Sequence, residues 1–486
     1  MLHFHQKEIN LVAINIINEG CDRVEYVFIE PEIIIYEYDN ELEKNYFLQT
    51  TDADWQKKTN KGASFKINAI AAEILLKFSG ENTYEAIISY FCNKYNENPA
   101  KVKSNIRALM LSLKTSYGFE MKTSNEPSDN HVKLLDYKGM YPTVVSIELT
   151  SNCNIKCKHC YGFFGECAKS EIPLDQLEPL FKGLVKAGVL TVELTGGDPS
   201  TYRYISEAIE IAVSSGIHSI ILLTNGISLS KKLIAVLEKH KKQVFVQIDL
   251  HSLDEAYYDW FTGSRNKLKF VKKNIQLLVS IGVAVRVVTI VTQKNIDELE
   301  DIADWSYEHG ATAFAASTVV SMGRAGNKQM EESLFFSTEK KFFDFVDIYQ
   351  KINKKYPGFI RIISEDRYQE EACGALINSV SINSKGKLKL CTMDTGEYFD
   401  LDFGNIFESQ FKDIYDQNQE FLKEFSQITL PNAETICRDC EHNLYCNRCI
   451  LRGLQKAGEK REDCIWYKNY ISNELKSRFN VPLKTP

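Results

Sequence analysis

The chain is predicted to be an α/β protein built around a partial TIM barrel of six parallel strands. From about residue 143, strand-like segments alternate with amphipathic helical segments, a pattern typical of a parallel sheet. The first 125 residues instead place strand-like runs, such as Glu32–Tyr38, before three short helices, which favours a winged-helix-like α+β domain. From about residue 346 the chain is turn-rich and cysteine-rich, as expected where metal replaces an apolar core.

The three N-terminal helices are indicated by their end signals and apolar stripes. The first is expected to stop at Gly80, the second to begin after Thr83 as N-cap, and the third to begin with Asn98 as N-cap and Pro99 at its first position. Their apolar faces are expected to be buried: Ile70, Ile74 and Phe78; Ile87, Phe91 and Tyr95; and Val102, Ile106, Leu109 and Leu113.

A polar stretch with proline and glycine, residues 123–142, is predicted to be a linker. This divides the chain into a domain at 1–122, the linker, a barrel at 143–345 and a C-terminal domain at 346–486. The strands of the barrel are predicted at Val144–Thr150, Thr191–Thr195, Ser219–Thr224, Val244–Asp249, Val283–Ile290 and Ala313–Ser317. An active site should lie where these strands end.

Composition excludes several classes of protein. The 486 residues carry a formal net charge of −7, which argues against nucleic acid as the main partner. Apolar runs of the roughly 18 residues needed to span a bilayer are absent, so no membrane span is expected. The start, MLHFHQKEIN, lacks a basic segment followed by an apolar one. A cytoplasmic location is therefore expected.

Thirteen cysteines point to metal binding. In a long chain without a signal peptide, metal ligation is a better explanation for so many cysteines than disulfides. Ten of them lie in two groups, at residues 153–160 and 373–464. The others are Cys21, Cys92 and Cys167; Cys92 falls in a predicted helix and is expected to serve packing, and Cys167 is expected to be a bystander.

The first group, Cys153, Cys157 and Cys160, directly follows the first barrel strand. Three cysteines can hold a cubane iron–sulfur cluster and leave one iron without a protein ligand, open to a substrate or cofactor. A zinc site is the alternative, but it would require a fourth ligand.

This motif resembles that of the radical SAM superfamily, and the resemblance covers roughly residues 143–325. It implies that the three cysteines hold a [4Fe–4S] cluster whose open iron binds S-adenosylmethionine (SAM). Tyr161 matches the aromatic residue after the third cysteine, near adenine. Gly196, Gly197, Asp198 and Pro199 close the second strand where the family usually has Gly-Gly-Glu-Pro. The glycines should let the backbone approach the SAM amino group.

Three further positions at or near strand ends match SAM contacts of the family. Asn225 follows the third strand, Asp249 ends the fourth where the family contacts the ribose, and Arg286 lies on the fifth where an arginine often pairs with the SAM carboxylate. Asn225 alternatively only makes a turn, and Arg286 an ordinary ion pair. The sequence assigns no catalytic acid or base.

The second group resembles the SPASM domain, which holds two auxiliary [4Fe–4S] clusters. Gly386 and Cys391 are separated by four residues, as in that domain, although only two residues separate Cys446 and Cys449. The family's interleaved ligation implies two sets: Cys373, Cys391 and Cys449 for the first cluster, and Cys437, Cys440, Cys446 and Cys464 for the second. The first set lacks an obvious fourth cysteine. A zinc ribbon is the alternative.

Residues of about 20–122 resemble the PqqD-like peptide-recognition domain, which binds a leader peptide as an added strand. A DNA-binding winged helix is the alternative, and the many glutamates between residues 25 and 43 argue against it. The three domains together resemble the sactipeptide and ranthipeptide maturases.

That resemblance implies three [4Fe–4S] clusters, SAM, a precursor peptide with a leader, and a flavodoxin- or ferredoxin-type electron donor. The implied enzyme activity joins cysteine thiols to carbon atoms of a ribosomally made peptide as thioethers, by way of a radical derived from SAM. The alternatives are carbon–carbon crosslinking or residue oxidation of a peptide, and a non-catalytic iron–sulfur electron-transfer protein.

Overall fold

The computed structural model describes residues 25–39, 44–50, 64–128, 131–166, 169–326, 334–336, 338–360, 373–396, 399–460 and 463–481. Cys21 and Cys167 lie outside these residues. The chain divides into two compact units, Met1–Ile33 with Ile70–Lys133 and Ile34–Ala69 with Leu134–Pro486. No helix within the described residues is long and apolar enough to cross a membrane.

The first unit combines an antiparallel sheet with three helices. Its strand order is β5 (Ser79–Thr83), β1 (Tyr26–Glu30), β6 (Glu120–Ser124), and its helices are α2 (Ala69–Lys77), α3 (Tyr84–Tyr95) and α4 (Pro99–Tyr117). The predicted caps are present: Thr83 Oγ1 accepts a hydrogen bond from the Ala86 amide, and Asn98 Oδ1 accepts one from the Lys101 amide. Cys92 lies in α3, as predicted.

Three predictions for this unit were wrong. Ile70 is 52% exposed, because α2 turns Ala71, Ala72, Ile74 and Leu75 inward instead. Tyr95 is 44% exposed, and its hydroxyl donates to Glu73 Oε2. Gly80, interpreted as a helix stop, lies in strand β5, which pairs with β1.

Residues 123–142, predicted as a linker, contain the end of β6 and all of β7 (Val132–Lys138). Strand β7 is the edge of a second sheet, of order β4 (Ser64–Ile67), β3 (Lys44–Thr50), β2 (Ile33–Asp39), β7. Within the second unit, Tyr36 and Tyr38 of this sheet pack with Tyr137 and Leu190, and the Tyr38 hydroxyl donates to the Gly188 carbonyl. Only one face of β7 is covered, so its sequence is polar enough to resemble a linker.

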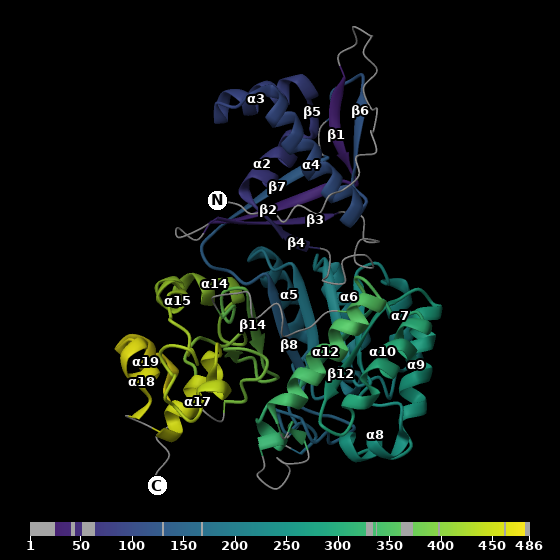
Figure 1. Ribbon diagram of the computed structural model, residues 1–486, viewed down its shortest axis with the longest axis vertical. Coiled ribbons are helices and arrows are strands. Elements are labelled where there is room, and N and C mark those ends of the chain that lie inside the picture. Colours follow the sequence, from purple (N-terminus) through teal and green to yellow (C-terminus); the bar gives the residue numbers. More distant parts are fainter. Residues whose placement is uncertain are drawn as a thin grey trace. The chain divides into compact units, whose positions relative to one another are not determined.

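The six predicted barrel strands are present and parallel. They are β8 (Val144–Thr150), β9 (Thr191–Gly196), β10 (Ser219–Thr224), β11 (Val244–Asp249), β12 (Ala284–Val291) and β13 (Ala313–Thr318). Helices alternate with them along the chain (Figure 1): α5 (Leu174–Lys186), α6 (Ile205–Ser214), α7 (Lys231–Lys239), α8 (Glu255–Thr262), α9 (Leu268–Ser280) and α10 (Leu299–Glu308).

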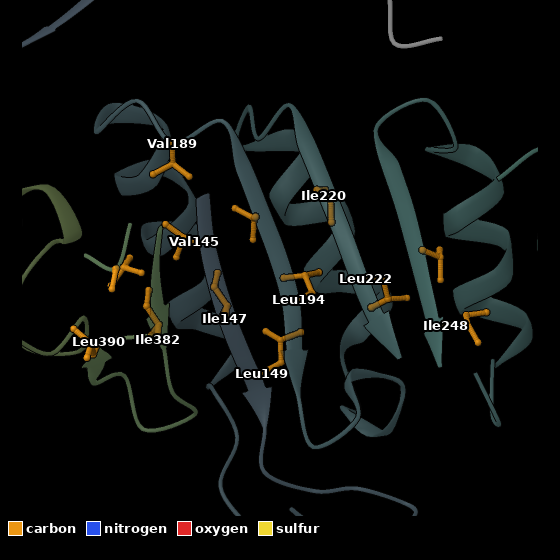
Figure 2. Close-up of a cluster of buried hydrophobic side chains, with 14 of the residues drawn as sticks. Val145, Ile147, Leu149, Val189, Leu194, Ile220, Leu222, Ile248, Ile382 and Leu390 are labelled. Atoms are coloured by element: carbon orange, nitrogen blue, oxygen red, sulfur yellow. The ribbon is translucent and has the colours of Figure 1, made fainter. Parts of the chain in front are cut away.

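The two faces of the barrel strands differ in chemistry. On β8, Val145, Ile147 and Leu149 are fully buried in the main apolar core, together with residues from neighbouring strands (Figure 2). Successive side chains of a strand point to opposite faces, so Ser146 and Glu148 lie on the other face of β8. Both are nevertheless buried, so the strand carries an apolar face and a buried polar one.

The C-terminal part extends the barrel sheet, which the sequence did not predict. Strand β14 (Ser379–Ile382) runs parallel to β8, and β15 (Leu388–Lys389) is antiparallel to β14, giving eight strands in the order β13-β12-β11-β10-β9-β8-β14-β15. Helix α12 (Glu339–Lys355) crosses the boundary predicted at 345–346. Further along the chain, the described residues form the helices α14 (Phe411–Gln417), α15 (Gln419–Ser426), α16 (Asn443–Cys446), α17 (Ile450–Lys460), α18 (Ile465–Tyr470) and α19 (Asn473–Phe479).

Candidate active site

The loop after β8 brings Cys153, Cys157 and Cys160 together. Burial, followed by the negative charge of the Cys153 and Cys160 thiolates, raises the pKa of Cys157, so the three sulfur atoms lie within electrostatic reach of one another. None of the three forms a disulfide. Iron binding displaces the protons of such thiols, so a buried group of free thiols is a suitable donor set for a cluster.

The C-terminal end of α8 accepts backbone hydrogen bonds from this loop. The amides on either side of Cys157, those of Lys156 and Lys158, donate to the carbonyls of Thr262 and Phe261 at 3.1 and 2.9 Å. A Cβ atom on Gly263 would stand 2.9 Å from the Lys156 carbonyl oxygen. The backbone around Cys157 is therefore packed tightly against α8.

Gly196, the last residue of β9, and Gly197 after it contact the cysteine loop. A Cβ atom on Gly196 would lie 2.2 Å from the Thr150 oxygen, and one on Gly197 would lie 2.1 Å from the Asn152 oxygen. The Gly197 amide also donates to the Thr150 carbonyl at 2.8 Å. The cysteine loop itself therefore requires both glycines, and their approach to the SAM amino group stays a prediction.

Asp198 ties β9 to the end of β10. Its carboxylate accepts hydrogen bonds from the amides of Ser200 and Asn225 at 2.8 and 2.7 Å and from Thr224 Oγ1 at 3.0 Å. Burial raises the pKa of Asp198, and these hydrogen bonds oppose that shift. Asn225 in turn donates from Nδ2 to Asn154 Oδ1 inside the cysteine loop. Both residues thus support the loop, in addition to any contact they make with SAM.

The C-terminal cysteines separate into two sets. Burial and the charges of Cys449, Asp394 and Cys373 raise the pKa of Cys391 to about 12. In the same way, burial and the charges of Cys464, Cys437 and Cys440 raise the pKa of Cys446 to about 12. The interleaved division implied by the sequence therefore matches the cysteines that lie near one another.

One cavity of about 350 Å³ is lined by all four cysteines of the second set. The described residues hold no group of three or more His, Cys, Asp or Glu side chains arranged to bind one metal ion. Four cysteines are a usual donor set of a [4Fe–4S] cluster, and the assignment of this set to the second auxiliary cluster stays a prediction.

Two family profiles match the chain at these sites. The profile described as the radical SAM superfamily matches residues 147–306, which contain the three-cysteine loop. The profile of SPASM, an iron-sulfur cluster-binding domain, matches residues 373–441. The chain is a radical SAM enzyme with a SPASM domain. Its cofactors are accordingly SAM and [4Fe–4S] clusters.

Individual proteins resemble this radical SAM enzyme over most of their length. It is 27% identical over 408 residues to the antilisterial bacteriocin subtilosin biosynthesis protein AlbA of Bacillus subtilis (strain 168), covering 83% of this chain and 88% of AlbA. It is 25% identical over 278 residues to the sporulation killing factor maturation protein SkfB of the same strain, covering 56% of this chain and 64% of SkfB.

The fold is shared with Streptococcus suis SuiB. The crystal structure of SuiB bound to S-adenosylmethionine gives a TM-score of 0.59 at 15% identity, covering 90% of this chain and 98% of SuiB. SuiB bound to its precursor peptide SuiA gives a TM-score of 0.54 at 15% identity, with coverages of 91% and 99%.

In this radical SAM enzyme, the Tyr161 ring lies edge-on to that of Phe164, with 5.8 Å between the ring centroids. Burial raises its pKa far above the usual value, and the charges of Glu148, Cys160, Cys391 and Glu193 raise it further. The Tyr161 hydroxyl is therefore within electrostatic reach of Cys160 and Cys391. Its assignment to the adenine site stays a prediction.

Asp249 and Arg286 lie on neighbouring strands but at different heights. Asp249 ends β11 beside Val288, and burial, with a smaller effect of the Asp198 charge, raises its pKa to about 7. Arg286 lies two residues before Val288 on β12, opposite Gln247 of β11. Its guanidinium donates to Gln247 Oε1 at 2.6 and 3.0 Å. Both roles towards SAM remain proposals for this enzyme.

Sequence reasoning missed Arg324, which follows β13. Its guanidinium donates to the carbonyls of Cys157 and Phe164 at 2.9–3.2 Å, and its amide donates to the Cys160 carbonyl at 2.9 Å. A Cβ atom on the preceding Gly323 would lie 2.3 Å from the Tyr161 oxygen. Only a Gly-Arg pair in a loop marks this contact in the sequence, and nothing local connects it to cysteines more than 160 residues earlier.

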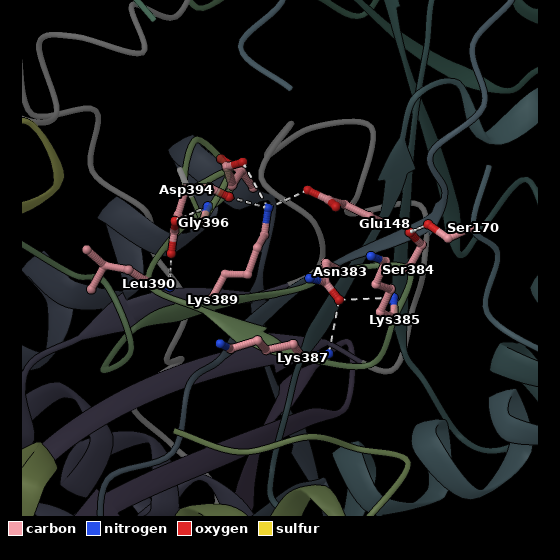
Figure 3. A network of polar contacts seen from close by, with 11 residues as sticks. Glu148, Ser170, Asn383, Ser384, Lys385, Lys387, Lys389, Leu390, Asp394 and Gly396 are labelled. Carbon is pink, nitrogen blue, oxygen red and sulfur yellow. Dashed lines mark hydrogen bonds and ion pairs between the residues drawn. The ribbon is translucent and has the colours of Figure 1, made fainter. Parts of the chain in front are cut away.

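A buried polar network joins the barrel to the SPASM domain (Figure 3). Lys389 Nζ donates to Glu148 Oε1 at 2.5 Å and to the Asp394 carbonyl at 2.7 Å. Nearby, the hydroxyl oxygens of Ser170 and Ser384 lie 2.6 Å apart. The first auxiliary site is thus tied to the barrel by side chains as well as by strand pairing.

Proposed function

We propose that the chain is a peptide maturase that forms thioether crosslinks between cysteine thiols and carbon atoms of a ribosomally made precursor peptide. The observation that carries the proposal is that β8, which leads into the three-cysteine loop, pairs with β14, and that Glu148 of β8 contacts Lys389, two residues before Cys391. Peptide bound near this contact would meet both cofactor sites. The printed names of AlbA and SkfB, one in subtilosin biosynthesis and the other in maturation of sporulation killing factor, support a peptide substrate.

The residues divide the work in the following way. Cys153, Cys157 and Cys160 would hold the SAM cluster, which together with SAM supplies hydrogen-atom abstraction from carbon. Asp249 and Arg286 would contact SAM from the barrel strands. The first auxiliary set (Cys373, Cys391 and Cys449) and the second (Cys437, Cys440, Cys446 and Cys464) would hold two further clusters.

The test is reaction of the reconstituted enzyme with SAM, dithionite and a cysteine-containing precursor encoded beside its gene. Each thioether should remove one pair of hydrogen atoms from the peptide and make one cysteine resistant to alkylation by iodoacetamide. Carbon–carbon crosslinking would remove the same hydrogens but leave every thiol alkylable. Absence of SAM cleavage would contradict the proposal and favour a non-catalytic iron–sulfur protein.

We also propose that the first unit binds the leader of the precursor. Helix α4 contacts β6, and β6 is an edge strand within the described sheet, so an extended peptide can add beside it. SuiB, whose fold is similar, has been crystallised with its precursor peptide.

Addition of a strand should protect backbone amides of β6 from hydrogen exchange, because the outward-facing amides gain partners. With saturating precursor, we expect exchange in Glu120–Ser124 to slow by about tenfold, while exchange in β10 stays unchanged. A precursor lacking its leader is the matched control and should give no protection. Equal protection by both peptides would contradict leader binding at this edge.

The chemistry needs a one-electron reductant, and we propose a flavodoxin- or ferredoxin-type donor in the cytoplasm. Lysines beside the SAM cluster loop support an acidic partner. Lys156 and Lys158 flank Cys157; the Lys156 side chain is 60% exposed and is paired with Glu166 Oε1 at 3.6 Å. Lys158 and Lys294 both lie over the Trp260 ring, at 5.2 and 4.1 Å from its centre. Lys158 and Lys294 together would steer an acidic protein towards Cys157.

A further inference from the structure

The ion pair of Glu148 and Lys389 crosses between the two cofactor-bearing parts of the second unit. Glu148 lies on β8, the strand that leads into the three-cysteine loop, and Lys389 lies on β15, just before Cys391. Their side chains are only 6% and 8% exposed, and the charged atoms are 2.5 Å apart. The pair therefore links the strand before one set of ligands to the strand before the other.

Lys389 also organises the turn that carries Cys391. Its ammonium donates to the Asp394 carbonyl at 2.7 Å and contacts the Thr392 carbonyl at 3.5 Å. The Asp394 carboxylate accepts hydrogen bonds from the amides of Leu390 and Gly396 (Figure 3). The Asp394 amide donates to the Cys391 carbonyl. The turn at residues 391–396 is thus built around one ammonium group and one carboxylate group.

Stability alone is a poor explanation for this pair. Removing two charges from water costs free energy that their attraction often fails to recover, so apolar residues of similar size are commonly as stable. A buried pair does, however, fix position. Ser146 of β8 is opposite Ser381 of β14, and Ser381 is opposite Lys389. A slip of one residue would turn Lys389 to the opposite face of the sheet and away from Glu148.

We propose that Glu148 and Lys389 are positioning residues that hold Cys391, and with it the first auxiliary site, in register with the SAM site. This proposal rests on the proposed function, since it concerns how often SAM cleavage ends in a crosslinked peptide. Loss of the pair loosens the Cys391 turn and leaves the three-cysteine loop intact.

The test uses the full-length enzyme with both charges removed, E148Q/K389M, so that no buried charge is left unpaired. We expect dithionite-driven SAM cleavage to stay within about twofold of wild type, and crosslinks formed per 5′-deoxyadenosine to fall at least tenfold. Electron paramagnetic resonance should show a shifted or missing first auxiliary signal with an unchanged SAM-cluster signal. In the metal-free protein, hydrogen exchange in residues 387–396 should accelerate.

Two further variants separate positioning from a general structural role. K387M breaks the exposed ion pair of Lys387 with Asp400, close to Lys389 in sequence, and should leave every readout unchanged. E148D/K389R keeps both charges and should restore most of the coupling.

The proposal is overturned if E148Q/K389M retains the wild-type auxiliary signal and exchange rates, or if all cluster signals fall together. If wild type itself forms no crosslink, the proposed function fails, and the resonance and exchange measurements still decide the role of the pair.

Discussion

Replacing Cys153, Cys157 and Cys160 together by alanine should abolish formation of 5′-deoxyadenosine. These three thiols lie close together in the loop after β8 and match the ligand pattern of the radical SAM superfamily. Without them there is no iron to chelate SAM. The seven C-terminal cysteines are unaffected, so iron content should fall by about a third, to roughly eight irons per chain.

The measurement combines iron and sulfide analysis with chromatography of the SAM cleavage products after dithionite reduction. A matched control is Cys92→Ala, since Cys92 lies on α3 of the first unit. This substitution should leave the iron content and the amount of 5′-deoxyadenosine at wild-type values. Persistent 5′-deoxyadenosine in the triple variant would show that SAM binds elsewhere. Loss of all iron would show that the three sites do not assemble independently.

The barrel could be predicted because its signals are local. Each strand is a short apolar run between turn residues, and the predicted limits of β8, β10 and β11 agree with the structure. The spacing of the cysteines and the family pattern imply how they group, and their role in holding the clusters stays a prediction. Cys391 and Cys446 indeed lie near the partners implied for each.

The parts that were missed depend on distant contacts. Strand β14 pairs with β8 across more than 230 residues, and its four residues carry no pattern that selects this partner. Arg324 reaches the cysteine loop from the end of β13 for the same reason. Ile70 lies in a helix rich in small apolar residues, where either of two faces could have been buried. Only the packed structure distinguishes these cases.

Gly197→Ala should disrupt the SAM site although it adds a single methyl group. The new Cβ atom would lie 2.1 Å from the Asn152 oxygen and 2.9 Å from the Ser151 oxygen, and both are backbone atoms that no side-chain rotation can move. The cysteine loop must then shift, and with it the hydrogen bonds from the Gly197 and Asp198 amides to the Thr150 and Asn152 carbonyls. Overpacking of this kind costs about 1–3 kcal/mol of stability.

We therefore expect Gly197→Ala to lose more than about 90% of SAM cleavage, a loss that corresponds to at least one factor of ten and to about 1.4 kcal/mol. The auxiliary clusters should remain, because their cysteines lie outside the displaced loop. Gly183→Ala is the control: Gly183 lies within α5, and its added Cβ would stand 3.7 Å from the Phe411 Cβ, an ordinary contact. That substitution should leave activity unchanged and raise helix stability by roughly 0.5–1 kcal/mol. Wild-type SAM cleavage by Gly197→Ala would mean that the loop can move without consequence, and that its close packing against β9 does not position the cluster.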